Sequence, residues 1–193
     1  MSKQKISAEA QAILSAADAG LHLTTIRLVE KFVETNPHSV RAWLDLGQAL
    51  GQLARYEQAE QAFQKVIELS GDQPNGAILG EIGNLYRARG DFETAIAWYQ
   101  KQIDAEPDDA MGYLYLGNIQ MRRGNFAAAK AAFASALACD RVCLEEAYYS
   151  MGLVNRCLGL ISEAKTHFKK AIELDPKFTQ AKVALKDVMS ATG

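Results

Sequence analysis

The sequence predicts an all-α protein built as a stack of antiparallel helix pairs. In the stretch 76–109, apolar residues recur with the period of a helix at Leu79, Ile82 and Tyr86, and again after Gly90. Gly90 can end the first helix because it adopts the left-handed backbone conformation at little cost. Variants of this stretch recur along most of the chain. Two helices this short cannot bury both apolar faces alone, so we expect each pair to stack on copies of itself.

The second helix of this stretch is expected to begin after Asp91 and to end before Pro107. Asp91 can accept hydrogen bonds from the first backbone N–H groups of a helix, and proline cannot continue one. The apolar stripe of this helix consists of Phe92, Ala95, Ile96, Tyr99 and Ile103. Gly83 and Ala95 are small, which lets the two helices cross with their axes only about 8 Å apart.

The same pair of small residues recurs along the chain. The aligned pairs are Gly47 with Ala59, Gly83 with Ala95, Gly117 with Ala129, and Gly152 with Ala164, each twelve residues apart. Successive glycines are separated by 36, 34 and 35 residues, which indicates a period of 34 with short insertions. Large apolar residues keep this register at Trp43, Leu79, Tyr113 and Tyr148 in the first helices and at Phe63, Tyr99, Phe133 and Phe168 in the second.

These residues resemble the tetratricopeptide repeat pattern. The matching motifs are Trp43-x2-Leu46-Gly47 with Ala59-x3-Phe63, and Leu79-x2-Ile82-Gly83-x2-Tyr86 with Ala95-x3-Tyr99 and Pro107. The resemblance covers about residues 40 to 176. It implies a right-handed superhelical solenoid of about five hairpins plus a C-terminal capping helix. The matching residues are buried ones, so the resemblance reports packing rather than chemistry.

The repeats predict one solenoid domain over residues 1–193. Its segments are a degenerate repeat at 6–37, repeats at 40–74, 76–109, 110–144 and 145–178, and a capping helix at 179–190. In the degenerate repeat, Ile13 and Thr25 replace the small residues, which predicts looser or differently angled packing. Ser39 is the expected N-cap of the next repeat, and Ala54 stands there in place of the turn glycine. The last helix is apolar on one side only, so it can cover the end of the stack and face water.

The composition argues against several classes of protein. Lys and Arg total 21 and Asp and Glu 23, so the net charge of -2 gives no general attraction to nucleic acid. No segment approaches the roughly 20 apolar residues that span a bilayer, so we expect no membrane partner. The first residues lack a signal-peptide core, and Cys139, Cys143 and Cys157 are an odd number. These observations predict reduced thiols and a cytoplasmic location, and they leave a redox role for the cysteines open.

The sequence shows no constellation for catalysis, and we expect no catalytic residue, no metal and no cofactor. His22, His38 and His167 lie in three different repeats, none in an HExxH pair, and are interpreted as surface residues. The spacing Cys139-x3-Cys143 lacks a second pair of ligands nearby. There is no glycine-rich phosphate loop after a strand and no GxSxG elbow. The chain is therefore predicted not to be an enzyme.

Each first helix carries a second stripe of residues between the packed ones. In the family that this chain resembles, first helices line a concave groove that holds an extended peptide or a partner helix. The resemblance therefore implies a peptide-binding groove with these candidate residues: Arg41, Leu44, Gln48, Asn84, Arg87, Leu114, Asn118, Met121, Arg122, Tyr149, Leu153 and Arg156.

The stripe also indicates what kind of segment would bind. Asn84 and Asn118 are 34 residues apart, and an amide offers both a donor and an acceptor to an extended backbone. The four arginines favour a segment that bears a carboxylate. The family's clamp for the carboxylate tails of chaperones uses a lysine in the first helix, where this chain has Leu44, Gly80, Leu114 and Tyr149. This departure disfavours a chaperone-tail adaptor and favours a partly apolar ligand.

Two functions of different classes follow from these expectations. The first is a non-catalytic scaffold that binds a peptide or protein segment in its groove. The alternative is a structural subunit that self-associates, as a homo-oligomer, or assembles into a larger complex. The sequence does not identify the partner, its orientation or the cellular process.

Overall fold

The structure, a computed structural model, describes residues 7–71, 74–139 and 144–190, and the regular elements in these ranges are all helices. They are α1 (Ala8–Asp18), α2 (His22–Thr35), α3 (Val40–Gln52), α4 (Tyr56–Ser70), α5 (Gly76–Arg89), α6 (Phe92–Ala105), α7 (Ala110–Arg122), α8 (Phe126–Ala138), α9 (Leu144–Cys157), α10 (Ile161–Leu174) and α11 (Thr179–Ser190). The predicted all-α fold class is confirmed.

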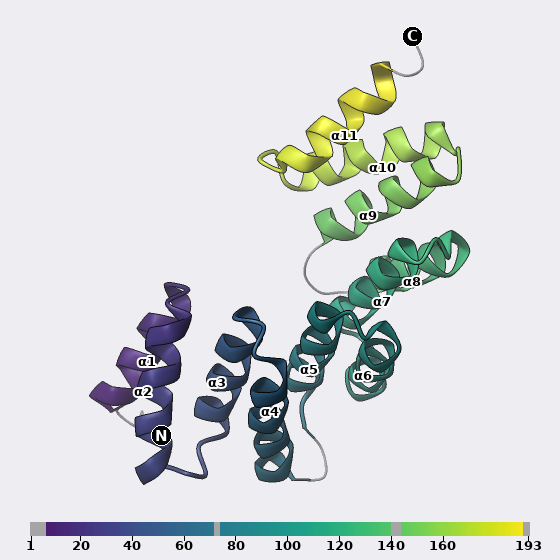
Figure 1. Ribbon diagram of the computed structural model, residues 1–193. Coiled ribbons are helices and arrows are strands. Elements are labelled where there is room, and N and C mark those ends of the chain that lie inside the picture. The colour runs from purple at the N-terminus through teal and green to yellow at the C-terminus, as the bar shows by residue number, and fades with distance from the viewer. Residues whose placement is uncertain (1–6, 72–73, 140–143, 191–193) are drawn as a thin grey trace, which may run out of the picture. The chain divides into compact units, whose positions relative to one another are not determined.

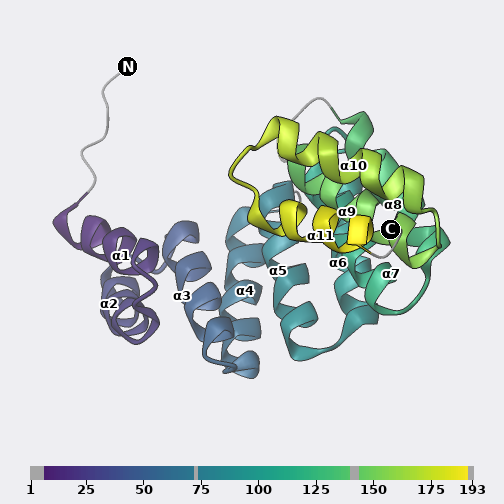
Figure 2. The ribbon, with the colours of Figure 1, turned by 90° about the horizontal axis from the view of Figure 1, so that it is seen from above.

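The chain divides into two compact units, Met1–Trp98 and Tyr99–Gly193, and the boundary falls within α6. In unit 1, α1 packs against α2 and α3 against α4, while α5 contacts both α3 and α4 (Figure 1). In unit 2, α7 packs against α8 and α9 against α10, and α11 lies along α10 (Figure 2). Consecutive helices therefore pair as predicted. The assignment of the whole chain to one solenoid domain stays a prediction.

Local signals in the sequence account for the helix ends. Gly90 takes the left-handed conformation with φ 89° and caps α5, and the side chain of Asp91 then accepts from the backbone N–H of Thr94 at 3.1 Å. Ser39 caps α3 in the same way. Ala54 is the one non-glycine residue with positive φ, 57°, among the described residues, and it occupies the turn where the other repeats have glycine.

In three of the hairpins, an aromatic ring of the second helix packs directly against a glycine of the first helix. A Cβ added at Gly47 would lie 3.0 Å from the ring of Phe63, and one added at Gly117 or Gly152 would lie 2.5 Å from the rings of Phe133 or Phe168. No real Cβ tolerates a distance of 2.5 Å. The glycines were predicted to allow close packing opposite alanine. The structure shows that the space is filled by the ring sixteen residues later.

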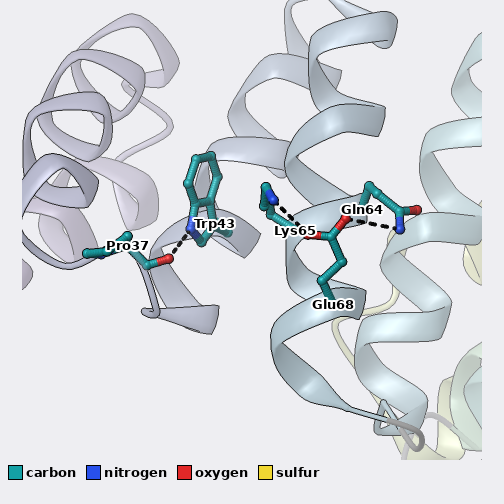
Figure 3. Close-up of polar contacts among 5 residues, drawn as sticks. All are labelled: Pro37, Trp43, Gln64, Lys65 and Glu68. Carbon is teal, nitrogen blue, oxygen red and sulfur yellow. Dashed lines mark hydrogen bonds and ion pairs between the residues drawn. The ribbon is translucent and has the colours of Figure 1, made fainter.

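In unit 1 the core runs through α1 to α5 and includes Val29, Phe63 and Val66. Trp43 was expected among the large packed residues, and it is half-buried at the edge of this core. Its indole N–H donates to the carbonyl of Pro37 at 2.9 Å, which ties α3 to the link that follows α2 (Figure 3).

On the surface of α4, Lys65 and Gln64 both contact the carboxylate of Glu68 (Figure 3). Exposed contacts of this kind contribute little to stability.

The degenerate segment 6–37 contains α1 and α2 as a helical pair. The two larger residues that replace the small ones, Ile13 and Thr25, are both buried, at 4% and 1% exposure. At the other end, α11 buries Ala181, Ala184 and Val188 and turns its lysines to water, which is the amphipathic pattern expected of a capping helix.

Unit 2 contains a buried polar contact that contradicts the interpretation of His167 as a surface residue. Asn155 of α9 is fully buried, and its amide nitrogen lies 2.9 Å from Nδ1 of His167 on α10. His167 is half-buried, and its ring stacks on Tyr148 at 6.0 Å. Burial lowers the pKa of His167 and the charge of Lys130 adds to this effect, while the backbone carbonyl and the carboxylate of Glu163 oppose it.

The predictions for the cysteines are tested only in part. Cys143 lies outside the described residues. Cys157 is exposed, and the thiol of Cys139 donates to the carbonyl of Ser135 at 3.3 Å. A redox role stays untested.

Replacing Gly117 with valine is expected to lower the free energy of unfolding by about 1–3 kcal/mol, because the added atoms overlap the ring of Phe133. Chemical unfolding followed by circular dichroism measures the change. The matched control is Ala134→Val at an exposed position of α8, where only helix propensity changes, by roughly 0.5 kcal/mol. Equal losses in the two variants would contradict packing of the ring on the glycine.

The thermal midpoint is expected to fall as the pH drops from 8 to 5. The folded-state pKa of His167 lies below its ordinary value of 6.5, so its contribution to stability is complete above 6.5 and is lost as the pH falls. His167→Gln should flatten this dependence, whereas His38→Gln, at an exposed position, should not. Parallel pH profiles for the wild type and both variants would show that His167 does not carry the effect.

Candidate functional site

Unit 1 contains a half-open cleft of about 540 Å³ over the first helices α3 and α5 and the start of α2. We refer to it as the unit 1 cleft. The residues that define it are His22 and Thr25 of α2, Asp45, Gln48, Gly51 and Gln52 of α3, and Glu81, Asn84, Arg87 and Ala88 of α5. Gly47, Phe63 and Leu85, which belong to the packed layer, also line it. The packing of ring on glycine thus supplies one wall of the cleft.

The polar residues of α3 and α5 occur in matching positions. Asp45 and Glu81 are 36 residues apart (81 minus 45), and so are Gln48 and Asn84 (84 minus 48). On each helix the acid and the amide are three residues apart, so both point to the same face. The cleft therefore presents a carboxylate and an amide from each of two neighbouring first helices.

Asp45 is the most deeply buried charged group of the cleft. Its side chain is 1% exposed and accepts from Nε of Arg41 at 2.8 Å, whereas Arg41 is 60% exposed. Burial raises the pKa of Asp45 above its ordinary value of 3.8, and the charge of Asp18 adds to this effect. The hydrogen bond and the charge of Arg41 act in the opposite direction and do not offset the burial.

On α5, an internal contact orients the amide. Nη2 of Arg87 donates to Oδ1 of Asn84 at 3.3 Å. The guanidinium therefore holds the carbonyl end of the amide, and a ligand that reaches Asn84 meets an amide already oriented by the chain.

Unit 2 contains a second cleft, of about 630 Å³, between α9 and α11. We refer to it as the unit 2 cleft. It is lined by Tyr149, Leu153, Arg156, Thr179, Gln180, Val183, Ala184 and Asp187. Tyr149 is fixed by ring contacts with Phe168 at 5.9 Å and with Phe178 at 5.1 Å. This cleft is more apolar than the unit 1 cleft and carries one charge of each sign.

The structure brings only part of the predicted stripe into these clefts. Gln48, Asn84 and Arg87 line the unit 1 cleft, and Tyr149, Leu153 and Arg156 line the unit 2 cleft. The predicted residues that line neither are Arg41, Leu44, Leu114, Asn118, Met121 and Arg122.

For two of these residues, contacts within the protein explain why they do not line a cleft. Leu114 is 1% exposed and belongs to the core of α7, α8 and α9, so it offers no surface to a ligand. Arg41 directs its guanidinium to Asp45 of its own helix.

Sequence reasoning missed the two carboxylates, Asp45 and Glu81. A signal was present, because both acids stand two residues before a repeat glycine, Gly47 or Gly83.

Two further observations concern metal ions and membranes. Among the residues that the structure describes, no group of three or more His, Cys, Asp or Glu side chains could hold a metal ion. No described helix is both long enough and apolar enough to cross a membrane.

Comparison with known proteins decides the family. A model described as "TPR repeat" matches residues 83–140, and one described as "Tetratricopeptide repeat" matches residues 40–73 and 145–178. The chain belongs to the tetratricopeptide repeat family. The resemblance carried by the buried glycines and aromatic residues is thereby confirmed, and with it the assignment to a class of protein-interaction modules.

Known tetratricopeptide repeat proteins are similar over part of their length. RNA polymerase II-associated protein 3 of Homo sapiens is 26% identical over 161 residues, which is 80% of this chain and 24% of that protein. Tetratricopeptide repeat protein 12 of Homo sapiens is 33% identical over 111 residues, which is 57% of this chain and 16% of that protein. The chain thus spans about a quarter or less of these relatives.

A solved structure similar to this chain contains a bound peptide. It is described as the first tetratricopeptide repeat domain of Spaghetti (RPAP3) bound to the HSP90 peptide SRMEEVD. It has 28% sequence identity and a TM-score of 0.57, and the match covers 61% of this chain and 93% of that one.

Replacing Asp45 with asparagine is expected to leave stability at neutral pH unchanged or slightly higher. The folded-state pKa is raised, so the stability associated with Asp45 is complete below 3.8 and is lost as the pH rises through the folded-state pKa. Asparagine never ionises, and its Oδ1 can still accept from Arg41. Unfolding at pH 7 and at a pH below 3.8 tests this, since the two proteins should converge at the lower pH. A loss above about 1 kcal/mol at pH 7 would show that the ionised carboxylate is needed for folding.

Proposed function

We propose that this chain is a non-catalytic interaction module that binds a peptide or protein segment on the exposed faces of its first helices. The observation that carries the proposal is the unit 1 cleft, where Gln48 and Asn84 stand in matching positions on α3 and α5. An amide can donate to a backbone carbonyl and accept from a backbone N–H, so two amides in register suit an extended chain.

The general spacing of packed helices is compatible with an extended ligand. Neighbouring packed helices lie about 8–10 Å apart, and an extended chain advances about 3.3 Å per residue. Equivalent side chains on two first helices would therefore meet every third residue of the ligand. Binding through the backbone would hold the segment extended and leave its side chains to determine selectivity.

The unit 2 cleft favours a partly apolar segment. Tyr149 and Leu153 offer apolar surface, and Val183 on the facing helix is 55% exposed. Arg156 at the same cleft can form a charge-assisted pair with a carboxylate of the ligand. For this unit we therefore propose a partly apolar segment that bears a carboxylate.

The similar RPAP3 domain is described as bound to an acidic HSP90 peptide. We do not extend that partner to this chain, because Leu44 and Gly80 stand where the family's clamp would have lysine. The proposed site is a binding surface, with no catalytic residue, no metal and no cofactor assigned to it. Nucleic acid and membrane are not proposed as partners, and a cytoplasmic location stays a prediction.

The alternative function, a self-associating structural subunit, is favoured by exposed apolar residues on two helices. Leu21 and Leu23 at the start of α2 are 53% and 72% exposed, and Met189 on α11 is 56% exposed. Apolar side chains in such positions can be covered by a second copy. Light scattering over a range of concentrations separates the two functions, because only this one requires a stable oligomer.

The double variant Gln48→Ala, Asn84→Ala is expected to bind peptides at least about tenfold more weakly, since two backbone hydrogen bonds to the ligand are lost. The probes are peptides selected from a random library on the wild-type chain, and fluorescence anisotropy gives the affinity. Circular dichroism should show unchanged helicity. The matched control is Gln61→Ala, Gln64→Ala, at exposed positions of α4. Unchanged affinity in the first variant, or equal losses in both, would exclude the cleft as the binding surface.

A further inference from the structure

We propose that a groove along α10 and α11 binds an acidic amphipathic helix of a partner protein. The groove has a volume of about 490 Å³, and we refer to it as the α10–α11 groove. No residue lines both this groove and the unit 2 cleft, so the inference goes beyond the proposed function. The lining residues are Ile172 of α10 and Lys182, Leu185, Lys186, Met189 and Ser190 of α11.

The groove lies on the face of α11 that corresponds to the face of α9 covered by α10. Three contacts define that face of α9. Tyr148 stacks on His167, Gly152 receives the ring of Phe168, and Asn155 contacts His167. The residues 34 positions later, one repeat period on, all line the groove, and they are Lys182, Lys186 and Met189. The groove therefore has the position in which a second helix packs along a first helix.

The apolar residues of this face are less covered on α11 than on α9. Met151 of α9 is 5% exposed and Asn155 is fully buried. At the equivalent places of α11, Leu185 is half-buried and Met189 is 56% exposed. Ile172 of α10 is also half-buried. These apolar side chains form a floor that a further helix can cover.

A second helix of the usual repeat type does not fit on this floor. Lys186 stands where α9 has Gly152, and a Cβ at Gly152 would already lie 2.5 Å from the ring of Phe168. The lysine side chain occupies that space, so an aromatic ring cannot pack on α11 at the same distance. Lys182 likewise replaces Tyr148. The helix that binds here therefore differs from a repeat helix, and the two lysines determine its chemistry.

The two lysines favour a helix that carries carboxylates. Lys182 and Lys186 are exposed and one helical turn apart, and among the described residues neither ammonium group has an ion-pair partner. Like charges at this spacing destabilise a helix slightly. The methylene stems of lysine can extend the apolar floor while the ammonium groups stay at its rim. Carboxylates on either side of an apolar stripe would pair with these groups.

The charge of the surrounding chain agrees with an acidic partner. Residues 165–190 contain six lysines and three acids, and so carry a charge of +3 in a chain whose net charge is -2. An acidic helix is therefore attracted to this part of unit 2 more than to the rest of the chain. None of the three acids lines the groove, and they are Glu173, Asp175 and Asp187.

The test is to pan a phage-displayed library of helices of about 18 residues against the full immobilised chain. Each member has leucines at i, i+3, i+4 and i+7, and the flanking positions vary among glutamate, glutamine, lysine and alanine. The expected result is enrichment of glutamate beside the leucines. A selected peptide remade with glutamine in place of glutamate should bind at least about fivefold more weakly in fluorescence anisotropy, because its charge-assisted contacts are lost.

The double variant Lys182→Gln, Lys186→Gln should lose the enrichment of glutamate and bind the selected peptide at least about fivefold more weakly. The matched control is Arg27→Gln, Lys31→Gln, which removes two exposed cations at the same spacing from α2. It should bind as the wild type does. Met189→Gln keeps both lysines and should also weaken binding, because it removes apolar contact from the floor. Circular dichroism should show unchanged helicity in all three variants, since the replaced residues are exposed.

Selected helices without enriched glutamate, or enrichment that persists in the double lysine variant, would overturn the proposal. Equal losses in that variant and its control would replace the groove by a general attraction between opposite charges. Binding to vesicles of phosphatidylserine and phosphatidylcholine in equal parts, with no helix selected, would assign the lysines to a membrane surface. Self-association of the wild type that Met189→Gln abolishes would assign the groove to a second copy. Each of these results leaves the binding surface on the first helices in place, because its residues lie outside the groove.

Discussion

The contact on which the rest of this structure depends is the aromatic ring that sits over a glycine. In the pairs Gly47 with Phe63, Gly117 with Phe133 and Gly152 with Phe168, the ring occupies the space where any other residue would carry a Cβ. The contact sets how closely two helices approach and how each is rotated about its axis. Once the rotation is fixed, the residues that face away from the partner helix are fixed too. The surface available for recognition is thus determined by a contact buried within each hairpin.

Because the rotation of each first helix is fixed, chemically different residues occupy equivalent positions on the exposed faces of these helices. The residue after each repeat glycine is Gln48, Asn84, Asn118 or Leu153, and the residue two places before it is Asp45, Glu81, Tyr115 or Ser150. These positions are equivalent in the fold and differ in charge and polarity. Unit 1 therefore presents carboxylates and amides, and unit 2 presents an aromatic and an aliphatic residue beside Arg156. A repeat architecture can vary its ligand chemistry in this way without changing its packing.

Two of the buried polar residues, Asp45 and Asn155, make side-chain contacts that bear on a titratable group. Asp45 lies in the unit 1 cleft with Arg41 at one oxygen, and Asn155 contacts His167 between α9 and α10. Burial shifts the pKa of both titratable groups toward the neutral form, upward for Asp45 and downward for His167. Asp45 lines a cleft, whereas His167 packs against a tyrosine ring, where its lowered pKa is expected to make stability depend on pH.

The sequence by itself determined the helical class, the repeat period, the helix ends at Gly90 and Asp91, and the amphipathic last helix. Each of these follows from local backbone preference or from a periodicity that one chain displays. Only the tertiary structure decided that Leu114 is buried, that Arg41 is engaged by Asp45, that His167 is half-buried, and that Asp45 and Glu81 share a cleft. Those outcomes depend on the exact rotation and spacing of neighbouring helices. A shift of a few ångströms between neighbouring helices decides whether a side chain is buried in the core or exposed to a ligand. The periodicity of the sequence does not determine the position of a helix to that precision.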